Sequence, residues 1–264
     1  MPPRIVRDNA TLVAEYDNLS SGDIVVGRVR IRTGEEHLLL DLAARRVILV
    51  PSAVSQLCSR SKVFQSRILA GYMVPGTAAV YNRHDALALI SEYGRRGVGR
   101  VVCKLDRANG GQGILLLNSI EEVYSNAVLG MLRFPFVVQP FIAGCEDVRV
   151  VMLGSLVEAY SRHNPHNFRQ NLHCGGSSSA YALAEAQIAL CREVMDRGGF
   201  PYAHVDLLLD PDGSTWLSEI NLRGGLRGAT LSQQDYLHAI EEIHAGILAG
   251  ISEEAERMEG QGAG

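Results

Sequence analysis

Two carboxylates and one carboxamide occupy positions that a β-hairpin would bring together on one face. Two extended, apolar-rich runs flank Asp212-Gly213, a dipeptide that favours a tight turn. With the turn centred there, Asp206 lies directly opposite Glu219, and cross-strand partners share a face of the sheet. Asn221 comes two residues after Glu219, so the alternation along a strand places it on that face as well. The spacing therefore predicts three oxygen-bearing side chains close together.

The charge of this cluster indicates what it would bind. Like charges placed opposite each other destabilise a hairpin unless another group neutralises them. A hard divalent cation with oxygen ligands, Mg²⁺ or Mn²⁺, would do so, with Asp206, Glu219 and Asn221 as its ligands. A solvated sheet face that tolerates two acids is the alternative that this pattern alone leaves open.

A glycine-rich loop follows a lysine near the end of a short apolar strand. The lysine is Lys104, and the loop contains Gly110, Gly111 and Gly113. Glycines let backbone amides approach phosphate oxygens closely, and the lysine would add a positive charge. An ordinary hairpin loop with a surface lysine is the alternative. The loop matches neither the P-loop pattern nor the dinucleotide-binding fingerprint, which argues against both of those sites.

Three more segments carry groups suited to a nucleotide or an anion. The run Gln139-Pro140-Phe141-Ile142 could offer backbone groups and apolar surface to adenine, or could be ordinary core. Asp147 and Arg149 share one strand face, as a surface salt bridge or as contacts to ribose and phosphate. Residues 167–176 are rich in basic and amide side chains and end in Gly-Gly, which suits a loop around an anion or a flexible surface loop.

Composition and charge limit the class of protein. The chain has 264 residues, 47% apolar and 20% charged, with a net charge of −4, which is typical of an ordinary globular α/β protein. The net charge gives no electrostatic case for nucleic acid or a membrane as a partner. Five scattered cysteines without zinc-site spacing, and the lack of a signal-peptide core or a long apolar run, predict a soluble, cytoplasmic protein with reduced thiols.

The elements that must position these residues fall into four parts of the chain. The first is expected to be short and β-rich, with strands at 24–31, 37–42 and 46–50. Pro140 argues against a central strand at its position and favours a linker between two lobes. The four parts are an N-terminal region (1–60), a lid of alternating helices and strands (61–137), a second lobe with the hairpin and a last helix at 232–248 (138–250), and a flexible tail (251–264).

The chain resembles the ATP-grasp superfamily, and specifically its RimK-like branch of ATP-dependent carboxylate–amine ligases. The ordered series Asn-Leu-His-x-Gly-Gly, Val-Asp-Leu and Glu-x-Asn is more specific than any single motif. Within the branch, the chain looks nearest to the ATP-grasp enzymes of the GAK system. The motifs that carry the resemblance fall in one order between about residues 61 and 248 and are Lys62, Lys104, the loop 109–113, the run 139–142, Asp147-Val148-Arg149, the loop 168–176, Val205-Asp206-Leu207-Leu208 and Glu219-Ile220-Asn221.

The resemblance implies an α+β (mixed α/β) ATP-grasp fold in which two lobes clamp ATP and residues 61–137 form a mobile lid. The implied contacts to ATP are Lys62, Lys104 and the glycine loop at the phosphates, Gln139–Ile142 at adenine, Asp147 near the ribose, and Arg169 and Asn171 by the γ-phosphate. The implied ligands of one or two Mg²⁺ or Mn²⁺ ions are Asp206, Glu219 and Asn221. The implied contacts to the reacting carboxylate or the transferring phosphoryl group, and so the candidate catalytic residues, are Arg149, Arg162 and Arg169.

The activity that the resemblance implies is Mg·ATP-dependent ligation of a carboxylate to an amine, or to a thiol, through an acyl phosphate, with release of ADP and phosphate. The partners would be a small-molecule or peptide carboxylate acceptor and an amine donor, and a homo-oligomer is left open. An ATP-dependent phosphotransferase on the same fold and a non-catalytic ATP-binding subunit are the alternatives.

The chain departs from the family pattern in three places. Cys174 stands where the family usually has a basic residue, and Leu222–Gly228 replaces a common Ser-Pro-Gly. The second change introduces Arg223 and Arg227, which would either bind an acceptor with phosphate or several carboxylates or pair with local acids. The domain that precedes the grasp in the family is reduced to residues 1–60.

Overall fold

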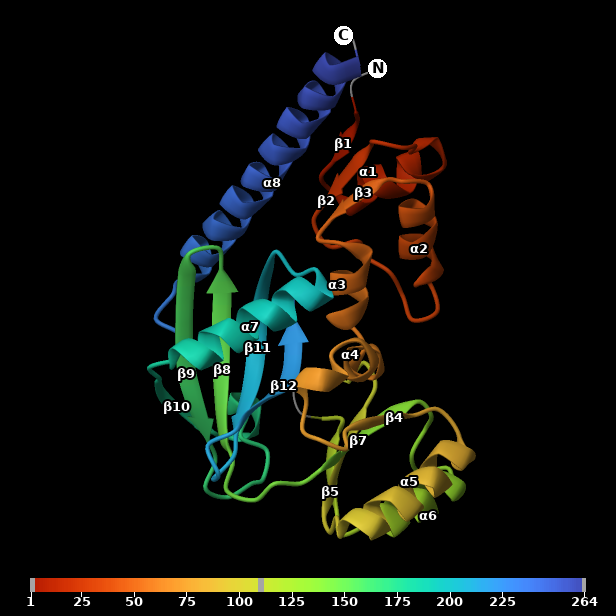
Figure 1. Cartoon of the computed structure of the whole chain (residues 1–264), viewed down its shortest axis with the longest axis vertical. Coiled ribbons are helices and arrows are strands. Elements are labelled where there is room, and N and C mark those ends of the chain that lie inside the picture. Colours follow the sequence, from red (N-terminus) through yellow and green to blue (C-terminus); the bar gives the residue numbers. More distant parts are fainter. Residues whose placement is uncertain (1–2, 109–111, 263–264) are drawn as a thin grey trace.

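Three β-sheets follow one another along the chain and form three bodies (Figure 1). The structure is a computed structural model that describes residues 3–108 and 112–262. We call the sheets the N-terminal sheet, the lid sheet and the central sheet, with three, four and five strands respectively. The mixture of helices and sheets agrees with the fold class that the sequence predicts.

The N-terminal body is a small parallel α/β unit. Its sheet has the order β1-β2-β3, and both strand pairs are parallel. The strands are β1 (Ile5–Val6), β2 (Ile24–Val26) and β3 (Ile48–Val50). The helices are α1 (Asn9–Glu15), the 3₁₀ helix η1 (Tyr16–Asn18), α2 (His37–Ala44) and α3 (Ala53–Cys58).

The expected strand at 37–42 is wrong, because these residues form α2, and the region is not β-rich. Leu39 and Leu42 are buried, whereas Leu40 between them is exposed, which is the spacing of a helix with one buried face. A short apolar run does not distinguish a strand from a buried helix by its periodicity alone.

The lid sheet is antiparallel and has the order β4-β7-β5-β6. Its strands are β4 (Ala78–Val80), β5 (Val101–Leu105), β6 (Ile114–Leu117) and β7 (Phe136–Pro140). Its helices are α4 (Lys62–Ile68), the 3₁₀ helix η2 (Ala70–Tyr72), α5 (Arg83–Arg96) and α6 (Ile120–Val128), of which α5 and α6 lie together beside the sheet (Figure 1). Local signals set the ends of these helices: Asn82 and Ser119 accept first-turn N–H groups, and Gly97 ends α5 with a φ of 63°.

The segment around Pro140 corrects the expected lobe boundary. β7 is an inner strand of the lid sheet, so residues 138–140 belong to the lid and the crossing to the central sheet begins after them. Pro140 is compatible with this strand because it is the last residue of β7. It is paired with Val101 of β5 on one side, and on the other side the pairing of β7 with β4 does not extend beyond Val138. The missing N–H of a proline therefore removes no inner ladder bond here.

The central sheet is antiparallel, with the order β10-β9-β8-β11-β12. Its strands are β8 (Glu146–Leu153), β9 (Leu156–His163), β10 (Ser177–Ala180), β11 (Tyr202–Leu209) and β12 (Thr215–Asn221). The 3₁₀ helix η3 (Leu172–Cys174) lies in the loop before β10. Helix α7 (Glu185–Gly198) covers one face of this sheet through Cys191 and Val194, which leaves the other face for the site (Figure 1).

Helix α8 (Gln233–Gly262) runs from the central sheet to the N-terminal body (Figure 1). The sequence predicts its end near residue 248 and a flexible tail from 251, whereas the helix continues to Gly262. Leu248, Ile247 and Ile251 pack against β2 and β3, and this contact explains the extension. Within the described residues, no helix combines the length and apolar character that a bilayer crossing requires.

Gln65 of α4 joins the lid to the edge of the central sheet. Its carboxamide oxygen accepts the N–H of Ile220 at 3.0 Å, and its nitrogen donates to the Ile220 carbonyl at 2.9 Å. The side chain is buried, so it completes the hydrogen bonds of an edge strand that water does not reach. This contact fixes the strand that carries Glu219 relative to the helix that carries Lys62.

We predict that Gln65→Leu lowers the free energy of unfolding by about 2 kcal/mol. The substitution leaves a buried N–H and a buried carbonyl of Ile220 without partners, which is the costly way to lose hydrogen bonds. Urea unfolding of the variant and of Gln234→Leu, an exposed glutamine of α8, measures the difference. Equal destabilisation by both substitutions would contradict the role given to Gln65.

Candidate active site

A cavity of about 660 Å³ lies between the lid sheet and the uncovered face of the central sheet. It brings together nearly all the side chains singled out from the sequence, although they come from segments more than a hundred residues apart. The predicted residues that line it are Lys62, Lys104, Gln139, Pro140, Phe141, Ile142, Asp147, Arg149, Arg162, Arg169, Asn171, Asp206, Glu219 and Asn221.

No predicted residue of the glycine loop is among the described residues that line the cavity. Gly110 and Gly111 lie outside the described residues. Gly113 is described, but it is buried beside the cavity and does not line it. A Cβ at Gly113 would lie 2.2 Å from the Cβ of Ala108 and 3.1 Å from that of Leu105, so the glycine permits close packing at the base of the loop. Gly113 therefore has a packing role, and the phosphate contact of the glycine loop stays a prediction.

The hairpin places Asp206 opposite Glu219, as the sequence predicts, although its turn differs. The strands pair Leu209 with Thr215, so the connecting loop is longer than the expected two-residue turn. A bulge between Asp206 and Leu207 then shifts the register by one residue and restores the expected pairing. His204 therefore lies opposite Asn221, and the oxygen-bearing side chains share the cavity face.

Four charged side chains form a chain of ion pairs on this face. Arg149 donates to both oxygens of Asp206, at 2.7 Å and 2.8 Å. Arg162 donates to Asp147 at 2.5 Å and forms an ion pair with the second oxygen of Asp206 at 3.1 Å. Both arginines, expected to contact substrate, are thus held by carboxylates of the central sheet. They can still direct their remaining N–H groups into the cavity that they line.

The protonation of the two acids differs. Burial opposes ionisation of Asp206, but the charges of Arg149 and Arg162 outweigh it and lower the pKa of this carboxyl. Burial raises the pKa of Asp147, because its attraction to Arg162 does not fully offset the loss of water. Asp206 is therefore ionised, as a metal ligand must be.

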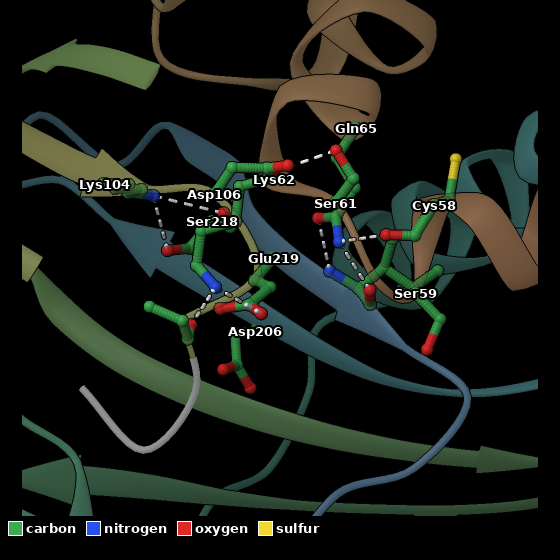
Figure 2. Close-up of polar contacts among 12 residues, drawn as sticks. Cys58, Ser59, Ser61, Lys62, Gln65, Lys104, Asp106, Asp206, Ser218 and Glu219 are labelled. Atoms are coloured by element: carbon green, nitrogen blue, oxygen red, sulfur yellow. Dashed lines mark hydrogen bonds and ion pairs between the residues drawn. The ribbon is translucent and has the colours of Figure 1, made fainter. Parts of the chain in front are cut away.

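Two lysines face the carboxylates from the lid side (Figure 2). Lys62 donates to the Ala108 carbonyl at 2.7 Å and lies 3.3 Å from Glu219. Lys104 contacts the backbone carbonyl and the hydroxyl of Ser218 at 3.2 Å and 3.3 Å. Both lysines are buried, so their charges act in a region of low dielectric.

The residues present fit a divalent cation. Asp206 and Glu219 are hard oxygen donors on paired strands, and Glu219 meets one cation, Lys62, among the described residues. The Asn221 carboxamide makes no hydrogen bond with any side chain or backbone group that the structure describes, so its oxygen is free to coordinate. Within residues 3–108 and 112–262, no group of three His, Cys, Asp or Glu side chains is arranged for a metal, so a metal here would depend on the carboxamide and on phosphate oxygens.

The loop before β10 reaches the lid. The Arg169 guanidinium donates to the carbonyl of Ile114 in β6 and stacks on the Phe168 ring, with 4.4 Å to the centroid. Asn171 caps η3 by accepting the N–H of Cys174 at 3.0 Å. Both residues also line the cavity, so they are placed to meet a phosphate that enters it.

The end of β7 and the two residues after it, Phe141 and Ile142, form one wall of the cavity. Gln139 is buried and pairs with Val102 of β5. The N–H of Phe141 donates to the Arg100 carbonyl at 3.0 Å, and the Arg100 guanidinium lies 4.7 Å from the ring centroid. The wall is thus fixed by the lid sheet on one side.

Sequence reasoning missed several residues that line the cavity, among them the polar side chains of Arg28, Tyr160 and Ser218. Arg28 follows β2 at the carboxyl end of a parallel sheet, the edge where α/β folds bind ligands. Recognising the parallel arrangement of residues 1–60 would have pointed to it. Ser218 occupies the β-bulge, and no sequence signal marks that position.

We predict that metal-free ADP binds more weakly as the pH rises above about 8. Burial lowers the pKa of Lys104 to about 8, so the lysine loses its charge as the pH rises through that value. Phosphate attraction is present while the amine is protonated, and affinity should fall by up to about tenfold per pH unit above the pKa. Calorimetric titrations in EDTA between about pH 7 and 9.5 measure this dependence. Lys104→Arg keeps its charge over that range, and a wild-type affinity as constant as that of the variant would refute the assignment.

Comparison with known proteins gives the chain its family. A model of the RimK-like ATP-grasp domain matches residues 59–240. A probable alpha-L-glutamate ligase of Cellvibrio japonicus is 32% identical over 177 residues, which cover 64% of this chain and 58% of the relative. Another, of Haemophilus ducreyi, is 28% identical over 231 residues, which cover 84% and 72%. The chain thus spans only 58% of the length of the first of these relatives.

Solved structures share the fold. The D-alanine-D-alanine ligase of Coxiella burnetii superposes with a TM-score of 0.61 at 15% identity, covering 92% of this chain and 74% of that one. The D-cycloserine synthetase DcsG gives 0.60 at 15% identity, covering 91% and 98%. Because the family model spans the lid, the cavity and the central sheet, the chain belongs to the RimK-like ATP-grasp family.

Proposed function

We propose that the cavity binds Mg·ATP and joins a carboxylate to an amine, with release of ADP and phosphate. The observation that carries this proposal is the meeting of Lys62 and Lys104 from the lid with Asp206 and Glu219 from the hairpin. Cations on one wall suit phosphate oxygens, and acids on the other suit the metal that accompanies them. Membership of the RimK-like ATP-grasp family supports ATP and a divalent metal ion as the ligands of this cavity.

The proposed reaction uses two displacements. The substrate carboxylate forms a bond to the γ-phosphorus of ATP as the bond to the β,γ-bridging oxygen breaks, and ADP leaves. The amine nitrogen then bonds to the acyl carbon as the bond from that carbon to the oxygen bridging it to phosphorus breaks. Phosphate leaves with that bridging oxygen, and the amine proton passes to phosphate or solvent. Bound Mg²⁺ would neutralise charge on the triphosphate oxygens.

The chain's own side chains would position the reactants. Lys62 and Lys104 would hold phosphate oxygens, while Asp206, Glu219 and Asn221 would hold the metal. Arg162 and Arg149 remain in place through their ion pairs and offer unused N–H groups to a substrate carboxylate. Arg169 links the central sheet to Ile114 of the lid and so would help to close the cavity against water, which hydrolyses acyl phosphates.

The relatives suggest one of the two substrates. Those of C. japonicus and H. ducreyi are named probable alpha-L-glutamate ligases. We infer that an amino acid such as glutamate is one reactant for this chain, with a small molecule or a peptide as the other. Glu, Asp and their amides are therefore the first compounds to test.

The test is release of ADP and phosphate from ATP in the presence of Mg²⁺ and a fractionated metabolite pool supplemented with glutamate. The proposal expects release that depends on an added carboxylate, a hydroxamate when hydroxylamine replaces the amine, and a product with a new amide. Formation of AMP and pyrophosphate would reject the mechanism. A stable phosphorylated product that forms without any amine would instead indicate a phosphotransferase.

A further inference from the structure

Two of the arginines that line the cavity, Arg28 and Arg223, have neither a hydrogen-bond partner nor an ion-pair partner for their side chains among the described residues. Arg28, from the N-terminal body, makes no side-chain hydrogen bond or ion pair with the residues that the structure describes, and its Nε is buried. Arg223, from the segment after β12, is exposed into the same cavity and has no partner within the described ranges either. Burial lowers the pKa of Arg28, and the positive charge of Arg223, which lines the same cavity, lowers it further.

The backbone on both sides of Arg28 is fixed. Its carbonyl accepts the side-chain N–H of Asn9 at 3.2 Å. The N–H of Val29 donates to the buried carboxamide of Gln56 at 2.9 Å, and Arg60 donates to the Val29 carbonyl. The guanidinium is therefore presented by a rigid loop, which lowers the entropic cost of binding a ligand.

The backbone on both sides of Arg223 is fixed as well. The N–H of Leu222 donates to the Ser59 hydroxyl at 2.9 Å, and Leu222 is buried. Gly224 packs on the His204 ring so closely that a Cβ would lie 2.6 Å from it. Arg227, for which the sequence leaves an anion contact or a local acid open, donates to the Leu172 carbonyl at 3.2 Å. Arg223 and Arg28 are the arginines of the cavity whose guanidinium groups have no partner among the described residues.

The charge of the cavity exceeds what its own acids offset. Among the described residues, eight lysines and arginines line it against three acids, in a chain whose net charge is −4. The acids Asp147, Asp206 and Glu219 are already paired with Arg162, Arg149 and Lys62. Like charges held together need an anion to neutralise them, and paired guanidinium groups match the oxygens of a carboxylate or phosphate.

We propose that Arg28 and Arg223 form a subsite for a second anionic group of a substrate, apart from the carboxylate that is activated. The inference rests on the proposed ligase function and names the substrate class: a compound that carries an additional carboxylate or phosphate. It also gives the short N-terminal body a function, since Arg28 is its contribution to the cavity.

The experiment compares amino acids that carry an additional anionic group with counterparts that lack it. Ligand-observed NMR titrations of the full chain, loaded with Mg·ADP, measure the affinities for L-glutamate and L-glutamine, and for O-phospho-L-serine and L-serine. We expect the wild type to prefer the anionic member of at least one pair by about tenfold or more. The pair that shows the preference identifies the anion as carboxylate or phosphate.

Variants then assign the preference to the two arginines. Arg28→Gln and Arg223→Gln should each reduce it about tenfold, Arg223→Lys should retain part of it, and Arg192→Gln, an exposed arginine of α7, should leave it intact. Unchanged ADP affinity shows that each variant is folded. No preference in either pair, or a preference that survives both Gln substitutions, would overturn the inference. Failure of the wild type to bind Mg·ADP would instead contradict the proposed function.

Discussion

Glu219→Ala should reduce acceptor-dependent ADP release by at least about 100-fold while leaving the protein folded. Removing one group that stabilises transition-state charge commonly costs that factor, and Glu219 is one of two carboxylates proposed for the metal. The fold should tolerate the change, because Glu219 is partly exposed and Lys62 keeps its bond to the Ala108 carbonyl. Because the buried Lys62 loses its acidic partner, we expect the free energy of unfolding to fall by about 1–2 kcal/mol, less than for Asp206.

Initial rates at saturating ATP, together with urea unfolding, measure both effects. Glu193→Ala is a matched control, because Glu193 is an exposed glutamate of α7 outside the cavity. Activity of Glu219→Ala within a few fold of Glu193→Ala would remove Glu219 from the metal site.

Asp206→Asn should abolish activity and also destabilise the protein by about 3–5 kcal/mol. Asp206 is the carboxylate between Arg149 and Arg162, and all three side chains are buried or nearly so. Removing one member of a buried ion-pair network leaves uncompensated charge, which costs far more than losing a surface pair. The two carboxylates of one hairpin thus differ: Glu219 serves mainly function, whereas Asp206 serves function and stability.

The comparison uses denaturant unfolding of Asp206→Asn and of Asp196→Asn, an exposed aspartate of α7. The control should be as stable as the wild type. An Asp206→Asn protein that matches it in stability would show that the arginines find other partners, and the proposed network would be wrong.

The site was predictable where its residues lie on regular strands. Alternation along a strand predicted that Asp147 and Arg149 lie on one face of the sheet. The hairpin predicted that Asp206 pairs with Glu219, and the structure confirms this pairing. That second success involved two compensating differences, because the loop is longer than predicted and the bulge at Ser218 shifts the register back. A turn dipeptide indicates a hairpin, but bulges depend on tertiary contacts that a sequence pattern does not contain.

The parts that were not predictable depend on long-range packing. The apolar run at 37–42 is compatible with a strand or a helix. It forms helix α2 because the helix buries Leu39 and Leu42 in the core of the N-terminal body. The extension of α8 depends on its contact with β2 and β3, which are distant in sequence. Arg28 could not be assigned to the cavity while its surrounding sheet was not recognised as parallel, and the partners of Arg149 and Arg162 required the sheet order β9-β8-β11.

Titration of the full chain with ADP, in the presence and absence of Mg²⁺, tests most directly whether lysines and carboxylates together form one nucleotide–metal site. We expect Mg²⁺ to tighten ADP binding by about tenfold or more in the wild type and to have no such effect in Glu219→Ala. Binding that is independent of Mg²⁺ in the wild type, or an equal effect of Mg²⁺ in the variant, would contradict it.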